Sequence, residues 1–300
     1  MQDRLINKVQ NVARRILGPT LSSIEQETAR VNVPPFHGPE NPLLRCSARY
    51  FSQNDEDGIV IEILRRIGLT KPGTFLEFGV ENGTECNTII LLAMGWCGGW
   101  AGGEPIVFDP PKGARLGFCQ GWITAANASD VAKRALSPVD RCLSDVQIAS
   151  IDLDGNDGPI ARSLLNAGLR PDLFILEYNA KFPPPLEFEM PYDQTHVWRG
   201  ADYQGVALQT WSNMLTGYRL VACNENGVNA FFVSDTHSGK FSDVPSNPAD
   251  LFRIGHYRRT FPRSGHPTTP ETVRHLATRQ VMQTSPALVP SLGLIDVTIA

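Results

Sequence analysis

The chain lacks the features that mark nucleic-acid-binding, membrane-spanning or disulfide-bonded proteins. Its 27 basic and 31 acidic residues leave a net charge of -4, so we expect no nucleic-acid partner. No apolar run approaches the length of a membrane span and the N-terminus has no signal-peptide core, which predicts a soluble, cytoplasmic protein without a transmembrane span. The six cysteines include no Cys-x-x-Cys pair, which argues against a zinc ribbon, and the expected compartment argues against a disulfide framework.

Internal repeats are also missing, and the 42% hydrophobic and 19% charged residues are typical of a globular protein. We expect three parts, at residues 1–49, 50–236 and 237–300. The first contains an amphipathic helix from Asp3 to Leu17 and a proline-rich linker from Val31 to Leu44. This helix is expected to dock on the protein's own domain or on a second subunit as a homo-oligomer, with a membrane surface as the alternative. The last part contains one helix candidate, from Pro270 to Gln283, and no expected catalytic role.

The middle part is organised around Thr74 to Thr88, an apolar run that breaks into glycines and then into cap-forming residues. This order predicts a strand, a tight loop and the start of a helix. Gly79 and Gly83 let the backbone bend sharply there and let a ligand approach the main chain. Glu104 follows about one half-unit later, where a carboxylate can accept both hydroxyls of a ribose. The spacing favours a nucleotide site over a plain turn, but it does not choose the nucleotide.

Local patterns predict the other elements of this part. They are a helix from the Ser52 cap through Ile67, strands at 122–125, 145–151 and 172–176, helices at 159–167 and 206–215, and a hairpin of 218–222 with 230–233. The acidic, amide-rich segment Gln53–Asp57 is either a solvated helix start or a ligand-facing loop.

Carboxylates cluster at the ends of two predicted strands. Asp152, Asp154 and Asp157 end one strand and Glu177 ends the next, and the carboxyl ends of neighbouring parallel strands face one crevice. Oxygen ligands of this kind suit magnesium rather than zinc, although a polar crevice that only hydrogen-bonds a ligand is the alternative. The segment does not match an EF-hand calcium loop, because Ser163 stands where that loop would have its downstream glutamate.

A long proline-rich and aromatic-rich connection from Phe182 to Gly205 follows the second of these strands. Its length and position predict a lid or an acceptor-binding loop. Tyr192, Trp198 and Tyr203 would stack on a sugar face, and His196 is a candidate general base or an acceptor-binding residue.

Five stretches in order resemble the FkbM-like branch of S-adenosylmethionine-dependent methyltransferases. They are Ser52–Gly58, Phe75–Thr88, Ser150–Asp157, Leu176–Asn179 and Gly227–Val233, and the likeness spans Tyr50 to Ser234. One departure is Glu81, which stands where the family pattern has a third glycine. The resemblance implies a doubly wound, Rossmann-like α/β fold with a seven-stranded sheet and an antiparallel last strand, flanked by N- and C-terminal extensions.

The same resemblance implies an O-methyltransferase that acts on a sugar or polyol hydroxyl, often in glycan or natural-product pathways. S-adenosylmethionine would be the cofactor and a small molecule or glycan the methyl acceptor, with Mg²⁺ as a further cofactor. The implied cofactor-binding residues are Glu77, Gly79, Gly83, Glu104, Asn127 and Asp152. Asp154, Glu177 and Asn179 would hold the metal, and Asp154 would be the base, with His196 as its rival.

The chemistry agrees in kind, because methyl transfer from a sulfonium requires oriented reactants and the removal of one proton from the acceptor hydroxyl. Two other functions remain open. A nicotinamide-dependent oxidoreductase would also use Glu104, although the chain has neither a clean Gly-x-Gly-x-x-Gly nor a Tyr-x-x-x-Lys pair. A non-catalytic scaffold in a biosynthetic complex is the third interpretation.

Overall fold

The computed structural model describes residues 40–107 and 114–255. The predicted N-terminal helix, most of the proline-rich linker and the helix candidate at 270–283 lie outside these residues. Within the described part, no helix has the length and apolar character needed to cross a membrane.

A seven-stranded sheet in the order β3-β2-β1-β4-β5-β7-β6 forms the centre of the protein. Its strands are β1 (Thr74–Phe78), β2 (Cys97–Gly102), β3 (Leu116–Gln120), β4 (Val146–Ile151), β5 (Leu173–Glu177), β6 (Tyr218–Cys223) and β7 (Asn229–Ser234). The first five strands pair in parallel, while β7 pairs antiparallel with both β5 and β6. This sheet confirms the doubly wound α/β fold with an antiparallel last strand. The strand order reverses between β1 and β4, the position where open α/β sheets bind ligands.

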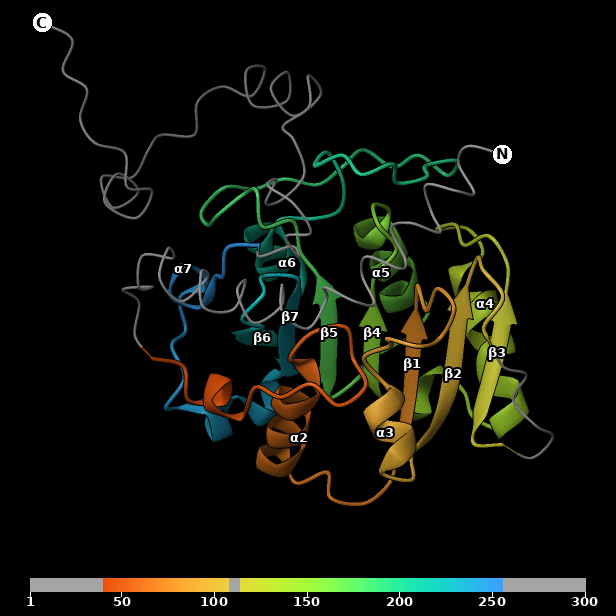
Figure 1. The fold of residues 1–300 in the computed structure, drawn as a ribbon, viewed down its shortest axis with the longest axis horizontal. Coiled ribbons are helices and arrows are strands. Elements are labelled where there is room, and N and C mark those ends of the chain that lie inside the picture. The colour runs from red at the N-terminus through yellow and green to blue at the C-terminus, as the bar shows by residue number, and fades with distance from the viewer. Residues whose placement is uncertain (1–39, 108–113, 256–300) are drawn as a thin grey trace, which may run out of the picture.

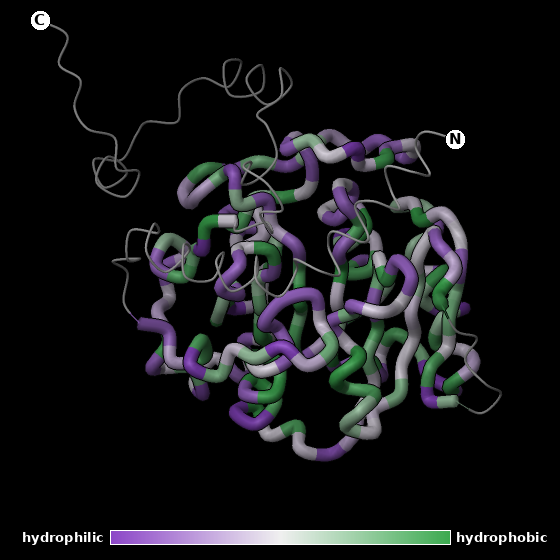
Figure 2. Tube along the Cα trace, in the orientation of Figure 1, coloured by the Kyte–Doolittle hydropathy of each residue, from purple (hydrophilic) through white to green (hydrophobic). Residues whose placement is uncertain are grey.

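Helices cover both faces of the sheet. They are α2 (Glu56–Ile67), α3 (Ile89–Ala93), α4 (Ala128–Leu136), α5 (Asp157–Asn166), α6 (Leu208–Met214) and α7 (Pro248–Leu251), with 3-10 turns η1 (Pro42–Cys46), η2 (Ser137–Val139), η3 (Leu143–Asp145) and η4 (Asp235–Phe241). Figure 1 shows α2 and α3 in front of the sheet and α4 and α5 behind it. The hydropathy colouring of Figure 2 shows hydrophobic residues along the central strands and α3, with hydrophilic residues recurring in the connections.

Helix α2 follows the predicted apolar periodicity. Ile59, Val60, Ile63 and Leu64 are at most 1% exposed, and the helix ends at Gly68, which takes a left-handed conformation with φ of 83°. The predicted cap at its start differs, since Asp55 is the N-cap residue and makes no capping hydrogen bond with its side chain. The side chain of Asp55 therefore does not cap this helix.

The predicted strand at 122–125 was wrong. The third strand is Leu116–Gln120, which pairs with β2, and Trp122 lies outside the sheet with 52% of its surface exposed. A Cβ on Gly117 would lie 2.1 Å from the carbonyl oxygen of Ala135, so glycine allows α4 to pack directly on this strand. The aromatic and β-branched residues of 122–125 imitate a strand locally, whereas the true strand contains the glycine that the helix contact requires.

The hydrophobic core reaches beyond residues 50–236. Leu43, Phe241, Leu251 and Phe252 belong to the same buried cluster as the central strands. Asn41 adds a hydrogen bond from its Nδ2 to the carbonyl oxygen of Val221, at 2.8 Å. The described flanking residues therefore pack as parts of one domain.

Candidate functional site

A small, open pocket lies at the carboxyl end of β1. Four carboxylates line it, from Glu77, Glu81, Glu85 and Asp152, together with four amide side chains, from Gln53, Asn82, Asn87 and Asn229. The described residues that line the pocket include no lysine, arginine or histidine. Because opposite charges attract across the low-dielectric wall of a cleft, this lining favours a positively charged, hydrogen-bonding ligand.

The glycine turn after β1 forms one wall of this pocket. Gly79 has φ of 87°, and a Cβ there would lie 1.4 Å from the carbonyl oxygen of Asp152, so only glycine lets β1 and β4 approach here. The turn closes through a hydrogen bond from the Gly83 amide to the Val80 carbonyl oxygen, at 2.7 Å. Glu81 takes a left-handed conformation with φ of 44°, a conformation that glycine adopts more easily than glutamate.

Glu77 is turned toward α3. Its carboxylate accepts hydrogen bonds from the amides of Asn87 at 2.8 Å and Thr88 at 3.0 Å, and from the Thr88 hydroxyl at 2.5 Å. Burial raises the pKa of Glu77, while these hydrogen bonds oppose that shift. Glu77 therefore supplies the negative group at the start of α3, the place that a ligand phosphate occupies in dinucleotide-binding sheets.

Three carboxylates meet at the ends of β4 and β5. One oxygen each from Asp152, Asp154 and Glu177 lies within 4.8 Å of the others. Burial, then the neighbouring carboxylates, raise the pKa values of Asp152 and Glu177 far above their usual range. Burial and Asp157 raise the pKa of Asp154 to about 6.

This group has the donor set of a hard cation. All three side chains offer oxygen, and Oε2 of Glu177 is buried without a hydrogen-bond partner among the described residues. Clustered buried carboxylates are costly unless protons or a cation neutralise them. Mg²⁺ or a similar ion fits these residues.

The side chain of the other predicted metal ligand, Asn179, is hydrogen-bonded to the backbone of the long connection. Its Nδ2 donates to the carbonyl oxygens of Asp202 at 2.7 Å and Gln204 at 2.8 Å, and its Oδ1 accepts from the Lys181 amide at 3.0 Å. Asn179 therefore stabilises the start of the long connection. Asp152, which the sequence analysis assigned to the cofactor, lies beside Asp154 and Glu177.

Glu104 and Asn127 lie outside the lining of the pocket. Glu104 is exposed two residues after β2, and its charge helps to raise the pKa of Glu81, after burial and Asp154. Asn127 is the N-cap residue of α4. Its Oδ1 accepts from the Thr124 amide at 2.8 Å and its Nδ2 donates to the Trp122 carbonyl oxygen at 3.0 Å, so its side chain holds the turn before the helix.

The connection between β5 and α6 runs along the edge of the sheet where the strands end (Figure 1). Asn156 fixes it there, since its Nδ2 donates to the Asp193 carbonyl oxygen at 2.7 Å. His196 lies against the carboxylate group, with Nε2 at 3.1 Å from the backbone oxygen of Asp154. His196 thus lies near Asp154, although the ring contacts the backbone of Asp154 and not its carboxylate.

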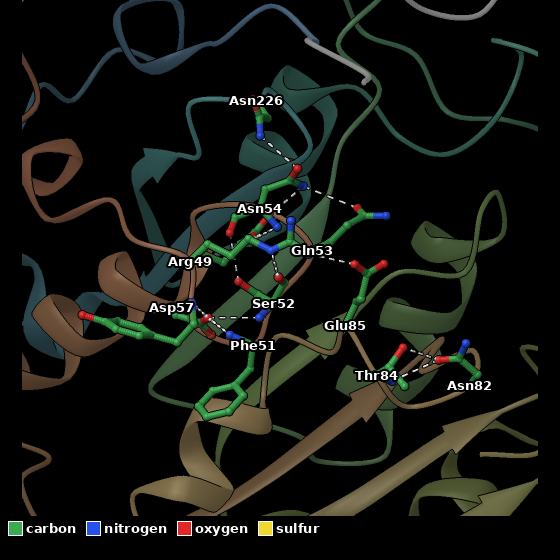
Figure 3. Close-up of polar contacts among 12 residues, drawn as sticks. Arg49, Phe51, Ser52, Gln53, Asn54, Asp57, Asn82, Thr84, Glu85 and Asn226 are labelled. Carbon is green, nitrogen blue, oxygen red and sulfur yellow. Dashed lines mark hydrogen bonds and ion pairs between the residues drawn. The ribbon is translucent and has the colours of Figure 1, made fainter. Parts of the chain in front are cut away.

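Figure 3 shows the segment of residues 49–57, of which Gln53 lines the pocket. Oδ2 of Asp57 accepts hydrogen bonds from three consecutive amides, those of Tyr50, Phe51 and Ser52, at 2.6 to 3.0 Å. Arg49 pairs with Glu85 across the rim at 2.8 Å. The acidic segment is therefore both helix start and pocket wall, because Asp57 orders the loop that carries Gln53.

Sequence reasoning placed Gln53 in a segment that is either a solvated helix start or a ligand-facing loop, and it missed Asn229 as a lining residue. The amide-rich composition of 53–57 was a signal for the first. For Asn229 the hairpin pattern located its strand, but no local pattern indicates that this strand end borders the pocket.

No known family model matches the chain, and no curated protein matches it in sequence. Among solved structures, it is similar to the MycE methyltransferase from the mycinamycin biosynthetic pathway in complex with Mg, SAH and mycinamycin VI, with 15% identity and a TM-score of 0.36 over 74% of this chain and 60% of that one. A second structure of MycE, with Mg and SAH, has 13% identity and a TM-score of 0.33 over 90% of this chain and 67% of that one. The chain thus spans less than two thirds of the length of the first of these.

Proposed function

We propose that the protein is an S-adenosylmethionine-dependent methyltransferase that methylates a hydroxyl group of a small molecule, such as a sugar or polyol. The observation that carries the proposal is the carboxylate-lined pocket at the point where the strand order reverses, with the group of Asp152, Asp154 and Glu177 at its edge. Asp152 belongs to both, so a cofactor in the pocket and an acceptor at the carboxylate group would be neighbours. The five family-like motifs support assignment to the FkbM-like branch as part of the same proposal.

The charge of the pocket fits this cofactor better than a dinucleotide. S-adenosylmethionine has a sulfonium and an ammonium group, which four lining carboxylates would attract. A nicotinamide dinucleotide has an anionic pyrophosphate, which needs a helix N-terminus or a basic side chain. Glu77 already occupies the start of α3, so the oxidoreductase alternative has no anion site here.

Residues at the ends of four strands would have separate roles. The backbone at Gly79 and Gly83 would lie against the methionine part of the cofactor, and Glu104, which lies outside the pocket lining but close enough to affect Glu81, would accept the ribose hydroxyls. A magnesium ion held by Asp152, Asp154 and Glu177 would lower the pKa of the acceptor hydroxyl. Asp154 is the proposed base, because its carboxylate would lie beside the acceptor hydroxyl, and in the absence of an ion burial and Asp157 raise its pKa to about 6.

The connection above the strand ends would bind the acceptor. It contains Tyr192, 44% exposed, whose hydroxyl accepts a hydrogen bond from the Ala125 amide, so the ring is fixed while one face stays open. An exposed, oriented aromatic ring of this kind suits stacking on a sugar face. His196 would help to position the acceptor from the same segment.

Calorimetry tests the cofactor first. Binding of S-adenosylmethionine and S-adenosylhomocysteine without binding of NADH supports the proposal, NADH binding alone supports the oxidoreductase, and binding of neither supports a scaffold. Transfer of a labelled methyl group to a panel of monosaccharides and polyols, with Mg²⁺ and with a chelator, then tests the acceptor and the metal. An Asp154→Asn variant that kept full transfer in both conditions would refute the proposed base.

A further inference from the structure

Asn229 is a buried amide in the pocket wall to which the proposed function gives no role. It is the first residue of β7, is 3% exposed and lines the pocket. Glu177 of the carboxylate group is its direct partner on β5. Asn229 therefore lies between the pocket and the end of β5.

The orientation of this amide is fixed by Glu56. The Nδ2 of Asn229 donates to Oε1 of Glu56 at 3.0 Å, and the same oxygen accepts from the Nδ2 of Asn224 at 2.8 Å. Oε2 of Glu56 accepts from the Asn54 amide at 2.9 Å. Since donors surround this fully buried carboxylate, the NH2 end of Asn229 must face Glu56.

The other end of the amide is unsatisfied. Oδ1 of Asn229 is buried and has no hydrogen-bond partner among the described residues. An unpaired buried acceptor is costly, and most such atoms in native proteins have a partner. The partner must be a donor, and the carboxylates around the pocket favour a cationic one.

We infer that Asn229, oriented by Glu56, recognises a primary ammonium group in the pocket. Resting on the proposed function, this group is the α-ammonium of the amino-acid part of S-adenosylmethionine. Asn229 is then a specificity residue for the cofactor, because an ammonium supplies the donor that Oδ1 lacks while a cofactor without an amino group leaves it unpaired.

The test compares two ligands on three proteins by calorimetry in the presence of Mg²⁺. The ligands are S-adenosylhomocysteine and its analogue without the α-amino group, and the proteins are the wild type, Asn229→Leu and Asn226→Ala. Asn226 is the matched control, because it lies on the same hairpin and donates to Oδ1 of Asn54 at 2.9 Å but does not line the pocket.

We expect the wild type and Asn226→Ala to bind S-adenosylhomocysteine about 10- to 100-fold more tightly than the analogue, the range of a hydrogen bond to a charged group. Asn229→Leu should bind both ligands with nearly equal affinity. Equal affinities in the wild type, or an unchanged ratio in Asn229→Leu, would overturn the inference. If the wild type does not bind S-adenosylhomocysteine at all, it is the proposed function that fails.

Two further measurements keep the test independent of how well the variant folds. The side-chain amide resonances of Asn229 in the wild-type ¹⁵N spectrum should shift more with S-adenosylhomocysteine than with the analogue, and equal shifts would contradict the inference. A titration with MgCl2 alone separates ammonium recognition from metal binding. Asn229→Leu should keep the Mg²⁺ affinity of the wild type, and a loss of that affinity would make Asn229 a metal ligand instead.

Discussion

The substitution Glu177→Gln tests whether the three-carboxylate group is a cation site. A residue that only supports the fold should destabilise the protein when it is changed, whatever the metal concentration. A carboxylate that belongs to a cation site should do the opposite without metal, since its removal relieves repulsion from Asp152 and Asp154. We therefore expect Glu177→Gln to be at least as stable as the wild type in EDTA.

The magnitude follows from the geometry. Two unit charges 4.8 Å apart repel by about 3.5 kcal/mol at an effective dielectric constant of 20. Protonation reduces this repulsion at neutral pH, because the pKa of Glu177 is raised well above its usual value. When Mg²⁺ binds the folded wild type alone, at 100 times its dissociation constant, it should add about 2.7 kcal/mol. For a domain of this size that corresponds to a rise of roughly 5–10 °C in the melting temperature.

Thermal unfolding with EDTA and with a MgCl2 series measures both effects. Asn156→Ala is the matched control, because Asn156 lies at the same strand end, carries no charge and exchanges hydrogen bonds with the backbone of Asp193 at 2.7 and 3.3 Å. It should lose about 1–3 kcal/mol in either condition. If Glu177→Gln is destabilised like this control in EDTA, or still shows the full Mg²⁺ shift, the reasoning about the cation site is refuted.

Three further predictions concern the fold around the site. Glu77→Ala should lose about 2–4 kcal/mol in urea unfolding, since it leaves the start of α3 without its buried carboxylate, and a loss below about 1 kcal/mol would contradict that role. Gly79→Ala should fail to fold or lose more than about 3 kcal/mol, because its Cβ would overlap the carbonyl oxygen of Asp152. Gly168→Ala, with φ of 99° and no atom within 4 Å of its Cβ, should lose only about 1–2 kcal/mol. If both glycine variants lost the same free energy of unfolding, backbone strain and not the overlap with Asp152 would explain the effect at Gly79. Two following arginines lower the pKa of Glu62 from 4.5 to about 2, so its stabilising effect is complete above pH 4.5 and disappears as the pH falls toward 2. Glu62→Gln should cost less than about 1 kcal/mol at pH 7 and nothing at pH 2, as urea unfolding at both pH values can check.

Much of the fold could be read from local patterns. The apolar stripe of α2, the run of β1 into Gly79, and the hairpin at Asn224–Gly227 each combine a periodicity with a stop or turn residue, and such signals depend only on neighbours in the chain. The third strand could not be found in this way. Gly117 weakens the strand pattern locally, and its reason is the contact with α4, which is distant in sequence.

The candidate site divides in the same manner. The carboxylates at two strand ends indicate a crevice because parallel strands end on one edge, and Asp154 and Glu177 do meet there. The third carboxylate of the group depends on the direction in which the side chains point, which the sequence does not show. Asp152, which was expected to bind the cofactor, turns into the group, whereas Asn179, which was expected to hold the metal, is hydrogen-bonded to the backbone of the long connection.

The sequence by itself determined most of the order of the elements and the acidic character of the carboxyl edge of the sheet, which follow from residue spacing and from topological rules. The doubly wound, seven-stranded sheet was expected from the family resemblance. Only the tertiary structure decided which buried polar groups have hydrogen-bond partners within the described residues and which do not. Glu77 is bound by α3, while Asn229 and Glu177 each keep one buried oxygen without a partner among the described residues. The physical reason is that hydrogen bonds between distant segments, such as that of Glu56 with Asn229, set these directions.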